Sequence, residues 1–208
     1  MKIKSNINLT NTSLFISISY VAAQIFSNIA SSKIALIGGF SIDGGTIIYP
    51  ITFTLRDLIH KSLGKEVARF IVFTAGLINA VIALLFWVVT LLPQDPGWGL
   101  QSEFALILGP VWRIVIASIV AQVVAELIDT EAYQFFVDKI SKKHQWGRVL
   151  FSNTFSVPAD SILFCLIAFY GAMPLSVVIS IIISNILVKG VVTVTSIPLI
   201  YTVAEEKQ

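Results

Sequence analysis

Long apolar stretches fill most of this chain, and nearly all of them are long enough for a helix to cross a lipid bilayer. A helix needs about 20 apolar residues to do so. On this criterion the sequence predicts six transmembrane helices, at residues 14–36, 46–62, 68–92, 104–137, 147–170 and 174–201. The stretches lack the period-two alternation of barrel strands, so the expected fold class is an all-α integral membrane protein. The second segment is short and contains Pro50, Arg56 and Asp57, and the fourth is too long to cross upright.

Basic residues alternate between the links that join these segments. Lys2 and Lys4 precede the first segment, and the links "HKSLGKEVAR" and "DKISKKHQWGR" are basic. The links "GGFSIDGG", "PQDPGWGLQSE" and "YGAMP" contain no lysine or arginine. Because cytoplasmic loops are enriched in these residues, both termini are predicted to face the cytoplasm. The expected organisation is a cytoplasmic segment 1–13, one six-helix transmembrane domain 14–202 and a cytoplasmic tail 203–208.

Polar residues inside four of the apolar segments recur at helical spacing. The first segment carries Tyr20, Gln24, Ser27, Asn28 and Ser31 within an arc of about 100°. The corresponding stripes are Ser118, Gln122, Glu126, Asp129 and Tyr133 on the fourth segment, Asn153, Ser156 and Asp160 on the fifth, and Asn185, Lys189, Thr193 and Ser196 on the sixth. Stripes of this kind are unfavourable against lipid, so we expect the four helices to line one polar cavity.

Asp160 and Lys189 are the charged residues expected nearest the middle of the membrane. Each ionised side chain there costs about 2.5–3.5 kcal/mol on insertion scales. Asp160 is about 15 Å from the outer end of its helix, and Lys189 is about one turn deeper on the next helix, an offset that a lysine stem can bridge. Two roles are open: an ion pair that only joins two helices, or a pair that also serves the cavity.

Three further pairs of charged residues have alternative roles. They are Arg56 with Asp57 in the inner half of the second segment, Glu126 with Asp129 near the cytoplasmic boundary, and Lys33 with Arg113 near the outer ends of their helices. The first pair is expected either to form a local ion pair, to reach the interface, or to contact a substrate. The second pair is either solvated or part of the cavity. The third pair either reaches the interface or gates an outer opening.

The composition agrees with a membrane protein whose activity lies within the bilayer. Hydrophobic residues make up 56% of the 208 residues and charged residues 12%, about half the charged share of a soluble domain. Cys165 is the only cysteine, so an intrachain disulfide is excluded. Gly38-Gly39 and Gly44-Gly45 are interpreted as turn glycines, because no Gly-Lys-Ser/Thr follows either pair. The chain has no Walker, paired His/Cys or Gly-x-Ser-x-Gly motif, so neither a metal, a cofactor nor an enzyme is expected.

Several motifs, in order along the chain, resemble one transporter family. They are "SNIASSK", "YPITFTLRDLIHKSLGKEVAR", "AELIDTEAY", "SNTFSVPADSILFCLIAFYGAMP", and "NILVKG" followed by "IPLIY". Together they resemble the queuosine precursor transporters of the vitamin uptake transporter type, from about residue 20 to residue 202. The resemblance implies import of 7-deazaguanine bases across the cytoplasmic membrane by a six-helix bundle. It also implies a bundle similar to the substrate-binding subunits of energy-coupling-factor transporters.

The positions that match the family are Asn28, Lys33, Asp57, Glu126, Asp129, Asn153, Asp160 and Lys189. The sequence departs from many members at Lys61 and Leu63, where they have Glu and Tyr, and at Pro158, where they have a polar residue. We therefore expect substrate contacts from Asp160, Lys189, Asn28, Gln24, Asn153, Glu126 and Asn185. We expect gating or coupling from Lys33, Asp57, Arg56, Arg113 and Asp129.

The chemistry of a 7-deazaguanine suits such a site. A carboxylate, from Asp160 or Glu126, would accept the paired N–H groups of the base, and Lys189 or a neighbouring amide would donate to its carbonyl. Pro158 would free a backbone carbonyl and bend its helix beside the cavity. The expected partners are a nucleobase-like small molecule and the bilayer, and no nucleic acid. Small residues at every fourth position, such as Ala117, Ala121 and Ala125, serve either packing within the bundle or a homodimer.

Two other functions remain open from the sequence. The chain could be the substrate-binding subunit of a multi-component, ATP-driven vitamin transporter, or a membrane protein without a transport function.

Overall fold

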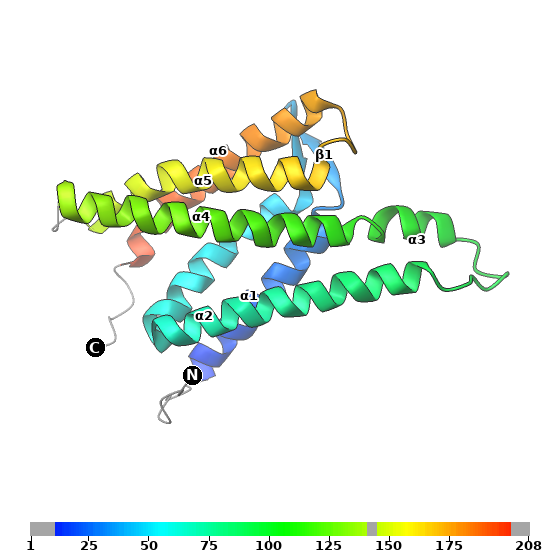
Figure 1. Ribbon diagram of the computed structural model, residues 1–208, viewed down its shortest axis with the longest axis horizontal. Helices are drawn as coiled ribbons and strands as arrows, with labels where there is room; N and C mark the ends of the chain where they lie inside the picture. The colour runs from blue at the N-terminus through cyan, green and yellow to red at the C-terminus, as the bar shows by residue number, and fades with distance from the viewer. Residues whose placement is uncertain (1–10, 141–144, 201–208) are drawn as a thin grey trace.

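The computed structural model describes residues 11–140 and 145–200, apart from the side chains at positions 57, 60, 61, 65, 145 and 196–200. The described chain is made of helices and one short β-hairpin (Figure 1). Its elements are α1 (Asn11–Ala30), β1 (Ile34–Ile37), β2 (Phe40–Asp43), the 3-10 helix η1 (Gly44–Ile47), α2 (Tyr49–Thr90), α3 (Gln101–Leu108), α4 (Val111–Lys139), α5 (Gln145–Phe169) and α6 (Leu175–Ile200).

The helices are those of a multi-pass membrane protein. Among the described residues, five helical segments are long and apolar enough to cross a bilayer: Asn11–Ala30, Glu66–Thr90, Gln101–Lys139, Trp146–Phe169 and Leu175–Thr195. The short expected segment 46–62 falls in the first half of α2, which is helical but is not among the five. The count of six spans and the cytoplasmic location of the termini stay predictions.

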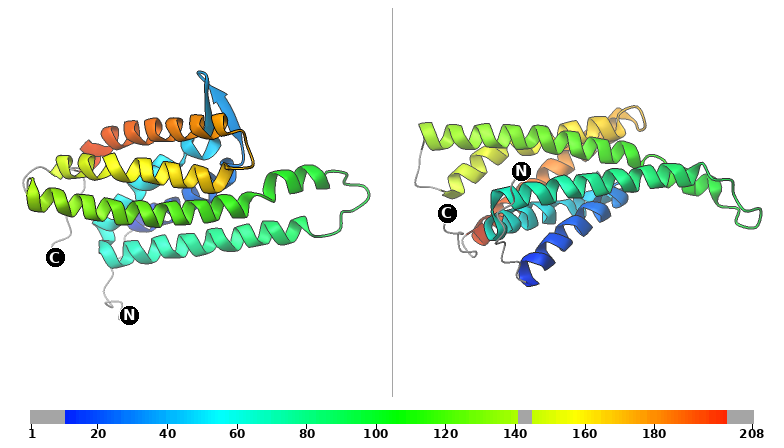
Figure 2. Two further views of the ribbon diagram at one scale, coloured as in Figure 1. Left: turned by 45° about the horizontal axis from the view of Figure 1, so that its top comes forward. Right: turned by 60° about the horizontal axis from the view of Figure 1, so that its bottom comes forward.

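A single residue divides α2 into two helical halves. Gly64 has φ 82° and ψ 167°, a backbone conformation that is open essentially to glycine alone. The chain changes direction there, and the second half of α2 runs beside α3 and α4 (Figures 1 and 2). The link expected between the second and third segments is therefore helical almost throughout, with its break confined to Gly64.

The first helix is shorter than expected, because a β-hairpin replaces its outer end. The helix ends at Ala30, and strands β1 and β2 pair antiparallel from Ile34↔Asp43 to Ile37↔Phe40. The turn is Gly38-Gly39, with φ of 59° and 85°, as a two-residue hairpin turn requires. The expected continuous helix 104–137 is also interrupted, since α3 and α4 are separate elements.

The elements form two groups, each with an apolar core, and a third, smaller core of Ala83, Val111 and Val115 joins the second half of α2 to α4. The N-terminal group consists of α1, η1 and α2, and its core contains Tyr20, Ile59, Ala68 and Ala75. The C-terminal group consists of α4, α5 and α6, which lie side by side (Figures 1 and 2), and its core contains Ile114, Ala117, Cys165, Ala168, Phe169, Val178 and Ile181. Where the two groups meet, this third apolar contact lies between α2 and α4, and buried polar residues gather around η1, α5 and α6.

The hairpin belongs to the N-terminal group in sequence but lies against α6. The backbone N–H of Ser41 donates to Ser180 Oγ at 2.8 Å, and Ser184 Oγ donates to the Ser41 carbonyl at 3.0 Å. The hairpin projects at one end of the bundle, and α6 ends at the other (Figure 2). At the hairpin end, therefore, β2 ties the two groups together.

Candidate functional site

A buried polar pocket lies between the two groups. The N-terminal group contributes Ser27, Asn28, Ser31, Asp43, Gly45, Thr46 and Tyr49, and the C-terminal group contributes Ser118, Asp160, Phe164, Asn185 and Lys189. The cavity among these side chains is about 20 Å³. Since one water needs about 10–15 Å³ of such space, the pocket in this conformation has room for a water-sized group but not for a bicyclic base.

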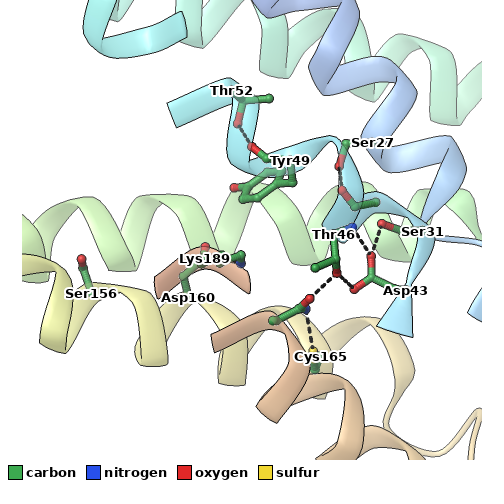
Figure 3. Close-up of polar contacts among 12 residues, drawn as sticks. Ser27, Ser31, Asp43, Thr46, Tyr49, Thr52, Ser156, Asp160, Cys165 and Lys189 are labelled. Atoms are coloured by element: carbon green, nitrogen blue, oxygen red, sulfur yellow. Dashed lines mark hydrogen bonds and ion pairs between the residues drawn. The ribbon is translucent and has the colours of Figure 1, made fainter. Parts of the chain in front are cut away.

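Asp160 and Lys189 form the predicted ion pair inside this pocket. Lys189 Nζ, from α6, donates to Asp160 Oδ2, on α5, and each residue is only 4% exposed. The ammonium also lies 4.8 Å from the centroid of the Tyr49 ring, at the start of α2 (Figure 3). The pair therefore joins α5 to α6 and contacts the N-terminal group through a cation–π interaction.

Asp43 is a second buried carboxylate on the same pocket, and the sequence analysis gave it no role. It caps the first turn of η1 and is 2% exposed. Its oxygens accept hydrogen bonds from Ser31 Oγ at 2.9 Å, from the Thr46 N–H at 3.1 Å and from Thr46 Oγ1 at 2.6 Å (Figure 3). The Asp-Gly-Gly-Thr sequence, with its carboxylate just ahead of a helical turn, was a signal for this cap.

Thr46 and Asn185 connect the two groups at the level of Asp43. Thr46 Oγ1 also contacts Asn185 Oδ1 on α6, and its single proton is donated either to this oxygen or to Asp43. Asn185 Nδ2 lies 3.5 Å from Cys165 Sγ on α5 (Figure 3). Asn185 is 2% exposed, so the contact is shielded from solvent and lipid. Cys165 thus contacts the polar cluster through Asn185.

Gly44 and Gly45 begin the 3-10 turn η1 and also allow it to pack closely on α1. A Cβ on Gly45 would lie 2.0 Å from Ser31 Oγ and 2.7 Å from the Ser27 carbonyl oxygen. A Cβ on Gly44 would lie 2.5 Å from the Ala30 carbonyl oxygen. The close approach brings the Gly45 carbonyl within 3.2 Å of the Ser27 hydroxyl, which donates to it.

The pocket includes four of the seven residues expected to contact substrate: Asp160, Lys189, Asn28 and Asn185. Asn28 also donates from Nδ2 to Asn79 Oδ1 at 2.8 Å. Gln24 is buried on α1 and donates to the Tyr20 hydroxyl at 3.1 Å, outside the pocket lining. Gln24 lies one turn of α1 before Asn28.

Asn153 and Glu126 also lie outside the pocket lining. Ser156 Oγ is 3.2 Å from Asp129 Oδ1 and 3.4 Å from Asn153 Oδ1. These three residues form a small polar cluster between α4 and α5, and Ser156 lies one turn of α5 away from Asp160. Glu126 is exposed, and its Oε1 is 3.9 Å from Arg56 Nη1 across the boundary between the groups.

The other residues expected to gate or couple have varied surroundings. Arg113 donates through Nε to the Ile167 carbonyl at 2.6 Å and through Nη2 to the Tyr170 carbonyl, at the end of α5. Lys33 is exposed in the turn between α1 and β1. The side chain of Asp57 lies outside the described residues. The sequence analysis missed Asp43, Thr46, Tyr49 and Phe164 as pocket residues.

Comparison with known proteins identifies relatives of the chain. A family model described as "Putative vitamin uptake transporter" matches residues 43–203. A "Probable queuosine precursor transporter" from Bacillus subtilis is 26% identical over 186 residues, covering 86% of this chain and 79% of that protein. One with the same description from Haemophilus influenzae is 31% identical over 61% of this chain and 51% of its own length. The "Queuosine precursor transporter" of Escherichia coli is 27% identical over 64% of this chain and 57% of its own length.

No solved structure matches the chain. The expected similarity to the substrate-binding subunits of energy-coupling-factor transporters therefore stays a prediction.

Proposed function

Because the chain belongs to the vitamin uptake transporter family, it is a transporter and not an enzyme, and we propose that it imports queuosine precursors across the cytoplasmic membrane. The proposed substrates are 7-deazaguanine bases such as 7-cyano-7-deazaguanine, its 7-aminomethyl counterpart or queuine. The names of the three relatives support this substrate class. The observation that carries the proposal is the buried Asp160–Lys189 pair, which lies in a polar pocket between the two groups of helices.

The proposed binding mode matches the edge of the base to the charged pair. The Asp160 carboxylate accepts the ring N–H and the exocyclic amine, and the Lys189 ammonium donates to the neighbouring carbonyl. Tyr49 and Phe164 supply aromatic faces for the flat ring. Asn28 and Asn185 supply amide groups that both donate and accept, which completes a pocket with apolar walls and a few placed polar groups.

Binding of a base requires the two groups to separate, because the cavity of about 20 Å³ is too small for it. Alternating access then follows as a rocking of one group against the other around the pocket. At the hairpin end, the contacts between the groups involve Ser41, Ser184 and the buried Thr46–Asn185 pair. At the other end, the Arg56–Glu126 pair has side chains 26% and 51% exposed. We therefore place the first opening at the Arg56–Glu126 end.

The test is binding and transport by the purified full-length protein. Thermal-shift titrations with the three precursors and with guanine should show saturable binding of the precursors and weaker binding of guanine. Asp160→Asn should weaken precursor binding at least about tenfold, the scale of one hydrogen bond to a charged group. Asp95→Asn, in an exposed loop, is the matched control.

Uptake by liposomes that contain only this protein should follow binding. Binding without uptake would favour a subunit that needs ATPase partners. No binding of any precursor, or equal binding of guanine, would overturn the proposed substrate.

A further inference from the structure

The charges on the pocket wall do not balance. The lining contains two carboxylates, Asp43 and Asp160, and one ammonium, Lys189. Lys189 is paired with Asp160. The groups that donate to Asp43 are all neutral: the Ser31 hydroxyl, the Thr46 hydroxyl and the Thr46 N–H. Within residues 11–140 and 145–200, no described cation forms an ion pair with Asp43, so an ionised Asp43 would leave the pocket with one uncompensated negative charge.

The role of Asp43 as a helix cap does not require this charge. Ser, Thr and Asn cap helices about as well as Asp, and a buried ionised group costs free energy unless it is paired. A carboxylate has about four lone-pair positions for hydrogen bonds, and the neutral donors use at most three of them. The remaining capacity, on a residue that lines the pocket, suits one further donor from a ligand.

We propose that Asp43 binds a protonated amine on the substrate and so selects cationic precursors, such as the 7-aminomethyl base, over the neutral 7-cyano base. This inference rests on the proposed function. Asp160 and Lys189 lie on α5 and α6, whereas Asp43 lies at the end of β2, where it caps η1, and all three line the pocket. A base whose six-membered ring contacts Asp160 and Lys189 presents its 7-substituent from a different edge, and in the proposed mode this substituent contacts Asp43.

The two 7-substituents differ in what they offer a carboxylate. A protonated aminomethyl group brings one positive charge and three N–H donors, which neutralise the pocket. A nitrile has no donor, and the negative end of its dipole is its outer nitrogen. Bound next to Asp43, it would leave the carboxylate uncompensated and displace any water there, at a cost in affinity.

The first experiment uses the unmodified full-length protein in nanodiscs. Dissociation constants are measured for the 7-aminomethyl base, for its N-acetylated form and for the 7-cyano base. Acetylation removes the charge and keeps the amide N–H. We expect the 7-aminomethyl base to bind at least about tenfold more tightly than either neutral base. Equal affinities, or tighter binding of a neutral base, would overturn the inference.

The second experiment removes the charge of Asp43. Asp43→Asn keeps the size of the side chain and its ability to cap η1. The affinity ratio between the 7-aminomethyl and 7-cyano bases should fall at least about tenfold, while the 7-cyano base binds as well as before or better. The control Asp95→Asn should leave the ratio unchanged. An unchanged ratio in folded Asp43→Asn would also overturn the inference.

The two proposals fail in different ways. If no 7-deazaguanine binds the unmodified protein, the proposed function is wrong. If the bases bind without preference for the cation, only the role of Asp43 is wrong. Should Asp43→Asn not fold, the comparison of the amine with its acetylated form decides the question in the unmodified protein.

Discussion

Lys189 on α6 donates to Asp160 on α5, and both residues are 4% exposed. This pair has two separable consequences, one for stability and one for transport. Removing one partner strands a buried charge, whereas removing both charges together does not.

We therefore expect Lys189→Met to lower the free energy of unfolding by about 3–5 kcal/mol, the usual cost of breaking a buried ion pair on one side. The double variant Asp160→Asn/Lys189→Met should recover most of that stability, as measured by denaturant unfolding in detergent. It should nevertheless fail to bind or transport precursors. A double variant that transports at the parent rate would show that the pair serves only to join the helices.

Gly45→Ala should destabilise the protein and weaken binding, because its Cβ would collide with Ser31 Oγ and the Ser27 carbonyl. Overpacking of this kind costs about 1–3 kcal/mol. The matched control is Gly76→Ala on α2, where no heavy atom lies within 4 Å of the added Cβ and helix propensity favours alanine by about 0.5–1 kcal/mol. Thermal unfolding of the two variants should move in opposite directions. Equal shifts would mean that η1 does not depend on its close approach to α1.

Arg113→Ala should lower stability and leave binding intact. Its guanidinium donates to the Ile167 and Tyr170 carbonyls at the end of α5, and each hydrogen bond from a charged group contributes about 1.5–3 kcal/mol. The exposed Arg69 supplies the control, Arg69→Ala. Unfolding and precursor affinity are measured on both. Normal stability with abolished uptake would instead support the gating role expected from the sequence.

The hairpin contact can be tested by cross-linking β2 to α6. In a Cys165→Ser background, Ser41→Cys and Ser180→Cys are joined with a short bis-maleimide, since the Ser41 N–H lies 2.8 Å from Ser180 Oγ. If this end must open during transport, the cross-linked protein should lose uptake, while the single-cysteine proteins treated with the same reagent keep it. Unchanged uptake after complete cross-linking would mean that β2 stays on α6 throughout the cycle.

The sequence predicted the helical membrane class and much of the polar interior correctly. All five residues of the first stripe, Tyr20 to Ser31, are buried, and the Asp160–Lys189 pair is confirmed. The buried stripe was predictable because helical spacing determines which residues share a face. The ion pair was predictable because an unpaired charge in the membrane interior is energetically costly.

Predictions of secondary structure and burial were wrong where a tertiary contact outweighed the local hydrophobic pattern. Residues 34–37 are as apolar as a helix end, yet Gly38-Gly39 turns them into a hairpin. Asp43 was assigned to a link between two segments with no role, and the packing of η1 on α1 buries it. Arg113 lies on a helix end where snorkelling was plausible, but the carbonyls that it caps belong to a helix distant in sequence.

The separate apolar cores have a consequence for biogenesis. The core of α1 and α2 is built from neighbouring stretches of the chain, so the N-terminal half is able to pack in the membrane before the ribosome has synthesised α5 and α6; the contact of Ala83 with Val111 and Val115 forms once α4 is in place. Severing the exposed loop at residues 91–100 and co-expressing the two fragments should then reconstitute an intact transporter. The pocket, by contrast, comes into existence only when both halves have been inserted and have met.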